Sequence, residues 1–228
     1  MKRVRGMEKK WDVSGGSLVL SGVDVMTGQT SMALEGETLS RDRELVRFVG
    51  RHGAVAIEHV MARMCVGRTA AYRRVAACMG RGLLERLDLV REEPSLLRAT
   101  RAGLRYAGLG LGVAVVSPGS VDHWLRCATT ALALSEEFGP ERVLSERELR
   151  LLKRIEGRAI ASAKVGELPG GEPRLHRPDL AVLAEERLIA VEVELTPKAP
   201  RRLEQLIRAW RRAGWVAEVR YLCGRAGG

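Results

Sequence analysis

The stretch over residues 188–196, LIAVEVELT, strictly alternates apolar and polar side chains from Val191 onward and therefore predicts a β-strand. Side chains of a strand point alternately to its two faces. We expect the apolar face to be buried against a helix and to consist of Val191, Val193 and Leu195. The opposite face carries Glu192 and Glu194. Two carboxylates on one face of so apolar a strand are not ordinary solvated charge.

The sequence around this strand predicts a mixed α/β (α+β) unit. RPDLAVL (177–183) predicts a preceding strand, Glu185–Glu186 a tight turn, and WVAEVRYLC (215–223) a last strand. A helix is expected from Pro200, because proline suits the first turn. Its apolar face contains Leu203, Leu206, Ile207 and Trp210. A long amphipathic helix should precede all these elements, from Ser120 onward, with core candidates Leu125, Ala128, Leu132 and Phe138.

Asp179 adds a third carboxylate, on the strand next to Glu192 and Glu194. Converging carboxylates repel one another unless a hard cation neutralises them, and Mg²⁺ or Mn²⁺ prefers such oxygen ligands. Ions of this kind activate water and stabilise charge on a phosphodiester. The sequence therefore predicts a metal site at these three residues. His123, Glu137 and Glu146 are weaker candidates, as a base and as additional acids.

The N-terminal half has a different pattern. We expect residues 1–38 to be a loosely ordered leader. The pattern over residues 39–108 predicts three short helices, then two strands joined by a turn at Glu93–Pro94, then a brief helix. In the third helix Ala71, Val75 and Cys78 are spaced for burial. Residues 109–118 are expected to be a linker to a second unit over 119–228.

The excess of positive charge lies in the first of these units. The whole chain of 228 residues has a formal net charge of +10, and segment 39–108 has fourteen basic and seven acidic residues, a net charge of +7. Such a segment is where a polyanion is expected to bind. The third helix would present Arg68, Thr69, Tyr72, Arg73 and Arg74 to phosphates and base edges. In the second unit, the helix after Pro200 offers DNA-binding candidates in Arg201, Arg202, Gln205 and Arg208.

Three short helices followed by two strands resemble a winged helix-turn-helix, in which the third helix enters the major groove. The matching features are the element order, Gly67 in the turn and GRGLLERL before the second strand. A winged helix that only docks another protein is the alternative.

The second unit resembles the PD-(D/E)XK restriction-endonuclease-like superfamily, whose core has the order αβββαβ. The resemblance rests on Pro178–Asp179, a gap of twelve residues, and Glu192-Val193-Glu194. Glu194 occupies the position of the motif's lysine, a replacement that some restriction enzymes of this superfamily tolerate. The resemblance makes Lys198, four residues later, a catalytic candidate as a substitute for that lysine. Together with the N-terminal winged helix, the segments VLSERELR, HRPDLAV and AVEVELTPK resemble those of the replication-relaxation family of bacterial plasmids and mobile elements.

These resemblances imply a DNA-binding protein acting in plasmid or mobile-element replication or transfer, as a Mg²⁺- or Mn²⁺-dependent DNA endonuclease. Two alternatives stay open: a catalytically inactive regulator of replication or copy number, and an adaptor for replication or transfer proteins. Double-stranded DNA is the expected partner, and a homodimer stays open. Cys65, Cys78, Cys127 and Cys223 form no C-x-x-C pair, which argues against a disulfide framework or zinc site. Without an apolar run of membrane-spanning length, we expect a cytoplasmic protein.

Overall fold

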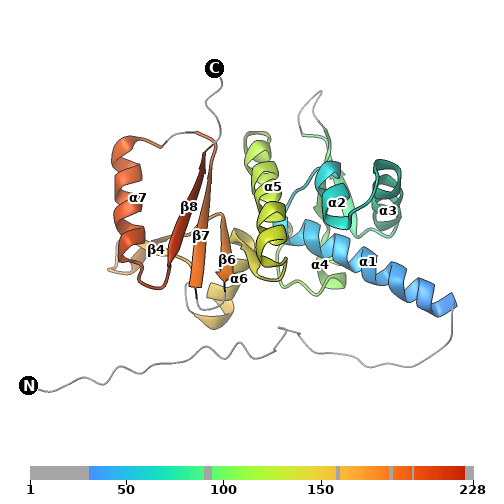
Figure 1. Cartoon of the computed structure of the whole chain (residues 1–228), viewed down its shortest axis with the longest axis horizontal. Helices are drawn as coiled ribbons and strands as arrows, with labels where there is room; N and C mark the ends of the chain where they lie inside the picture. Colours follow the sequence, from blue (N-terminus) through green and yellow to red (C-terminus); the bar gives the residue numbers. More distant parts are fainter. Residues whose placement is uncertain (1–30, 90–93, 158–159, 185–186, 197, 224–228) are drawn as a thin grey trace, which may run out of the picture.

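The long helix α5 (Val121–Phe138) lies between a small helical unit and a mixed β-sheet (Figure 1). The helices and sheets confirm the mixed α/β (α+β) class expected from the sequence. The computed structural model describes residues 31–89, 94–157, 160–184, 187–196 and 198–223. Within these ranges no helix is both long and apolar enough to cross a membrane.

The first helix, α1 (Ser31–His52), begins inside the segment that was expected to be a leader. That expectation is wrong for residues 31–38, because SMALEGET contains good helix formers and no proline to stop a helix. Residues 1–30 lie outside the described part of the chain. Leu45, Val46 and Val49 of α1 are buried, so the helix supplies one wall of the first core.

The next elements follow the predicted order: α2 (Ile57–Met64), α3 (Arg68–Gly80), β1 (Leu84–Leu87), β2 (Leu96–Ala99) and α4 (Arg101–Tyr106). Strands β1 and β2 pair in an antiparallel arrangement, with Leu84 opposite Ala99. The buried residues of α3 are Ala71, Val75 and Cys78, as the spacing predicted. Glu93 of the expected turn lies outside the described residues. Residues 107–117, which include most of the expected linker, form no helix or strand.

The second unit is built on a four-stranded sheet with the order β3-β6-β7-β8. Its strands are β3 (Val143–Ser145), β6 (Leu180–Ala184), β7 (Arg187–Glu194) and β8 (Glu218–Cys223). β6 is antiparallel to both β3 and β7, whereas β8 is parallel to β7. Between β3 and β6 the chain forms α6 (Glu146–Glu156) and a separate hairpin of β4 (Ala163–Glu167) and β5 (Pro173–His176). The hairpin was not predicted from the sequence.

Helices cover both faces of this sheet (Figure 1). Ile189 and Val191 of β7 join a core with Ala131 and Leu134 of α5, whereas Ala190 joins a core with α7 (Pro200–Arg212). The core candidates of α5 were therefore partly wrong, because Leu125, Leu132 and Phe138 are only half-buried.

The predicted burial of Val191 and Val193 is confirmed, but that of Leu195 is wrong, since it is 38% exposed. Strand β7 ends at Glu194, so alternation no longer directs Leu195 inward. On α7, Leu206 and Trp210 are buried as expected, while Ile207 is 44% exposed. The buried stripe of α7 instead continues through Ala209.

Two arginines connect the units on either side of α5. Arg51 of α1 forms an ion pair with Glu148 of α6 at 2.7 Å and donates a hydrogen bond to the carbonyl of Pro140. In the opposite direction, Arg147 of α6 donates to the carbonyl of Gly50 at 2.6 Å. Both arginine side chains are half-buried, and these contacts hold the first unit against the second.

His52 lies in the core beside these arginines, and its Nδ1 has no hydrogen-bond partner among the described residues. Burial, reinforced by Arg51 and other nearby cations, lowers the pKa of His52 to about 3. The unfolded chain therefore binds one more proton than the folded chain between the unfolded pKa of about 6.5 and the folded pKa. Stability contributed by neutral His52 is present above pH 6.5 and is lost as the pH falls.

We expect the free energy of unfolding to fall below pH 6.5, with His52 contributing up to about 1.4 kcal/mol per pH unit. The variant His52→Phe keeps a ring beside Phe48 and should show a shallower decrease when urea unfolding is measured from pH 7.5 to 4.5. His59, whose pKa burial also lowers, stays in the variant and retains its own share. Equal slopes in both proteins would contradict a neutral, buried His52.

Candidate functional site

The exposed face of α3 is the first candidate site. Because Ala71, Val75 and Cys78 point into the core, the opposite face of the helix points to solvent. Gly67 caps the start of α3, and Cys65 takes a left-handed conformation (φ 51°) that turns the chain between α2 and α3. The predicted residues Arg68, Thr69, Tyr72 and Arg73 are all exposed on this face.

Arg74 is paired more deeply than Arg68, whose exposed side chain lies 3.4 Å from Glu58. Its guanidinium lies 2.8 Å from Oδ1 of Asp42, and Arg81 lies 3.0 Å from Oδ2 of the same carboxylate. Asp42 is buried, and a buried carboxylate is costly unless it is paired and hydrogen-bonded. Arg74 therefore neutralises Asp42 of α1, which is a structural role and not the free DNA contact that the sequence suggested.

Asp179 immediately precedes β6 and is held on two sides. Its Oδ2 accepts a hydrogen bond from the backbone N–H of Val193 at 2.8 Å. Its Oδ1 lies 3.2 Å from Nε2 of His123 on α5. The backbone carbonyl of Asp179 also accepts from the N–H of Glu146 at the start of α6. Both oxygens of the side chain thus have fixed directions, and one of them points to α5.

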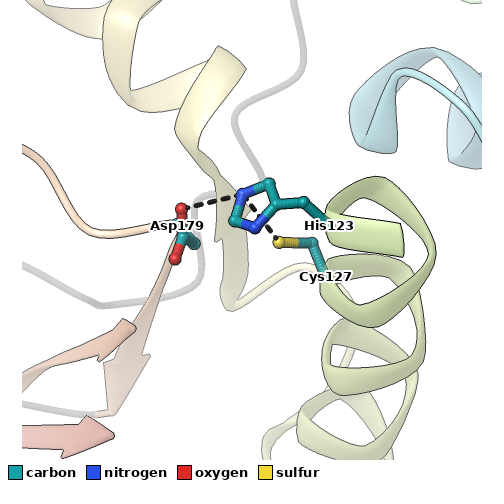
Figure 2. A group of neighbouring side chains, drawn as sticks. All are labelled: His123, Cys127 and Asp179. Atoms are coloured by element: carbon teal, nitrogen blue, oxygen red, sulfur yellow. Dashed lines mark hydrogen bonds and ion pairs between the residues drawn. The ribbon is translucent and has the colours of Figure 1, made fainter. Parts of the chain in front are cut away.

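His123, Cys127 and Asp179 form a compact group between α5 and β6 (Figure 2). The Sγ of Cys127 lies 3.5 Å from Nε2 of His123, one helical turn away. The hydrogen bond to Asp179 raises the pKa of His123, although burial opposes it and the charge of Lys198 is also unfavourable. Burial raises the pKa of the Cys127 thiol, and the charges of Asp179 and Glu146 add to the effect.

Glu192 lies on the other face of the sheet, under α7, and is 2% exposed. Its Oε1 lies 2.6 Å from Nε2 of His176 and accepts a hydrogen bond from Nε1 of Trp210 at 3.2 Å. Burial, together with the Glu192 carboxylate, raises the pKa of Tyr221 on β8 to about 12. Glu192 is thus the acceptor at the centre of a buried polar cluster.

Glu194, the third predicted metal ligand, is paired with Lys198. Lys198 comes four residues after Glu194, and its ammonium group contacts the Glu194 carboxylate. Among the described residues, His123, Cys127 and Asp179 form the one group of three or more candidate ligands whose donor atoms all lie within 4.8 Å. Asp179, Glu192 and Glu194 do not form such a group, so their arrangement does not fit one shared Mg²⁺ or Mn²⁺.

The remaining candidates, apart from Arg201, are also paired within the chain. On α7, Gln205 accepts from Arg202 at 2.8 Å and donates to the carbonyl of Val165, while Arg208 pairs with Glu204. Arg201 is exposed. The acids proposed as additional ligands pair elsewhere: Glu137 with Arg220 and Glu146 with Arg150.

Sequence reasoning missed Cys127 and the pair His176–Glu192 as parts of a site. His123 and Cys127 are four residues apart on a helix and therefore share a face, which was a usable signal. His176 comes three residues before Asp179 in HRPD, but its contact with Glu192 depends on the unpredicted hairpin β4–β5.

Comparison with known proteins adds no relative to this description. No protein-family model matches the sequence, and a search of curated proteins finds no significant match.

The buried cluster predicts a cost for removing Glu192. Glu192→Ala leaves the N–H of Trp210 without its acceptor and His176 without its partner. We therefore expect the free energy of unfolding to fall by about 1–3 kcal/mol. Urea unfolding should show a lower midpoint with an unchanged m-value. The matched control is Glu204→Ala, which removes an exposed glutamate of α7 and should change stability by less than about 0.5 kcal/mol. Equal effects of the two substitutions would argue against the cluster's structural role.

Proposed function

We propose that this protein binds duplex DNA through α3 and acts as a regulator of plasmid or mobile-element replication. The observation that carries the proposal is the exposed face of α3, where Arg68, Thr69, Tyr72 and Arg73 lie together. Arg73 forms no ion pair within the described residues, and α3 has no acidic residue along its length. Arginine and tyrosine suit phosphates and base edges, and phosphate contacts supply most of the affinity for DNA.

The order α1-α2-α3-β1-β2 supports assigning the first unit to the winged helix-turn-helix fold. In that arrangement α3 enters the major groove and the β1–β2 hairpin lies beside the backbone. α3 lies at the edge of the molecule, away from α7 (Figure 1), so a duplex can approach it without obstruction from the sheet. The arginines of α7 belong to a different surface.

The order α5-β3-β6-β7-α7-β8 supports a nuclease-like fold for the second unit, with α6 and the β4–β5 hairpin inserted. The partners of the three motif carboxylates favour a regulator over a nuclease. Asp179 is engaged by His123 and a backbone N–H, Glu192 by His176 and Trp210, and Glu194 by Lys198. A nuclease would have to break several of these contacts to share a cation among the three.

A metal-dependent DNA endonuclease is the second candidate, and one observation favours it. The ammonium group of Lys198 pairs with Glu194, which compensates for the missing lysine of the motif. Mg²⁺ or Mn²⁺ would be the cofactor, held by Asp179, Glu192 and Glu194 after rearrangement of their ion pairs. An adaptor that binds only proteins is the third candidate, and DNA-binding measurements separate it from the other two.

DNA binding is tested by the salt dependence of affinity for a duplex. Each phosphate contact contributes about 0.9 to the log–log slope, so Arg68→Ala and Arg73→Ala should each flatten it by about that amount. Arg74→Ala should chiefly lower stability, because Asp42 loses a partner. The matched control is Arg150→Ala, since the Arg68 and Arg150 side chains are both 64% exposed. Its slope should equal that of the wild type.

An unchanged slope in Arg68→Ala and Arg73→Ala would place the DNA surface elsewhere. If the protein fails to bind duplex DNA at every salt concentration tested, the result would support the adaptor.

DNA cleavage separates the regulator from the endonuclease. Supercoiled, linear and single-stranded DNA are incubated with the protein and Mg²⁺ or Mn²⁺, and products are resolved on gels. A regulator binds the supercoiled DNA and leaves it intact. Nicking that is lost in both Asp179→Ala and Lys198→Ala, with DNA affinity retained, would establish the endonuclease instead.

A further inference from the structure

His123, Cys127 and Asp179 bring three different donor atoms within 4.8 Å of one another: an imidazole nitrogen, a sulfur and a carboxylate oxygen (Figure 2). Two of the donors come from successive turns of α5 and the third from the residue before β6. The donors therefore lie on two elements whose packing is fixed by the core between α5 and the sheet. This group is unrelated to the α3 surface proposed to bind DNA.

Two of the three separations between the donors match tetrahedral coordination. Zinc bonds of about 2.0–2.3 Å in a tetrahedron separate nitrogen from oxygen by roughly 3.3 Å and nitrogen from sulfur by roughly 3.6 Å. The corresponding distances are 3.2 Å from His123 Nε2 to Asp179 Oδ1 and 3.5 Å from the same nitrogen to Cys127 Sγ. A hydrogen-bonded His–Asp pair alone would not require a thiol at this distance.

The surroundings orient these donors as a metal site requires. The second oxygen of Asp179 accepts from the N–H of Val193, which fixes the carboxylate and leaves Oδ1 directed toward His123. Such contacts behind a ligand hold it in place and tune its affinity for metal. The side chains of His123 and Asp179 are only partly buried, so an ion can enter. Glu146 is close enough to affect the pKa values of both His123 and Cys127 and adds negative charge.

We propose that His123, Cys127 and Asp179 bind a thiophilic divalent metal ion, with Zn²⁺ as the class of ion that this donor set selects. Thiolate and imidazole favour zinc over Mg²⁺ or Mn²⁺, which prefer oxygen ligands. Binding replaces the thiol proton of Cys127, which is released to solvent, and requires the unprotonated Nε2 of His123. Three protein ligands leave the fourth tetrahedral position to water or an external ligand.

Cobalt substitution tests the site directly, because Co²⁺ bound to a thiolate gives a charge-transfer absorption in the near ultraviolet. The full chain is freed of metal with a chelator, kept in a phosphine reductant, and titrated with Co²⁺. We expect the absorption to saturate at one ion per chain, to persist in excess Mg²⁺ and to disappear when Zn²⁺ is added. Zn²⁺ should also raise the melting temperature.

Cys127→Ser should abolish the charge-transfer absorption and the thermal shift, and His123→Gln should weaken Co²⁺ binding by more than about 100-fold. The matched controls are Cys65→Ser and Cys223→Ser, which remove exposed thiols and should behave as the wild type. Circular dichroism checks that each variant is folded. If Cys127→Ser does not fold, His123→Gln, at a partly exposed position, takes its place as the test variant. The proposed metal site is contradicted if the wild type shows no charge-transfer absorption. It is also contradicted if the absorption persists in Cys127→Ser or is lost in either control.

Discussion

The alternation of side chains along β7 is the constraint on which the candidate sites of the second unit depend. Ile189 and Val191 must face α5, because burying these side chains stabilises the sheet–helix layer. Glu192 is then forced to the opposite face, under α7, where burial would be costly without the donors His176 and Trp210. The same packing presents α5, with His123 and Cys127, to the start of β6.

The competing interpretations of this protein differ in the role that they give to Asp179. A nuclease needs its carboxylate beside those of Glu192 and Glu194, whereas the structure directs one oxygen to Val193 and the other to His123. The neighbouring thiol of Cys127 changes the chemistry further, because sulfur and nitrogen donors select a different class of metal from three carboxylates. The proposed DNA-binding regulator, with its proposed thiophilic site, would leave these contacts intact.

The division between predictable and unpredictable features follows the range of the interactions. The buried stripe of α3 was predicted from spacing alone, and its exposed face followed as the complement. The role of Arg74 was missed because its partner, Asp42, lies thirty-two residues earlier on α1. Lys198 was considered as a substitute for the motif's lysine, but only the course of the loop after β7 brings it to Glu194.

The sequence by itself determined the local elements: the helix α3, the strands β6 and β7, and the helix α7 that begins at Pro200. Periodicity suffices for these because burial along one helix or strand depends on neighbours within a few residues. Only the tertiary structure decided which polar groups meet: Asp42 with two arginines, Glu192 with His176 and Trp210, and Asp179 with His123. A buried charge takes its partner from whatever element the packing brings near, and no local pattern encodes that choice.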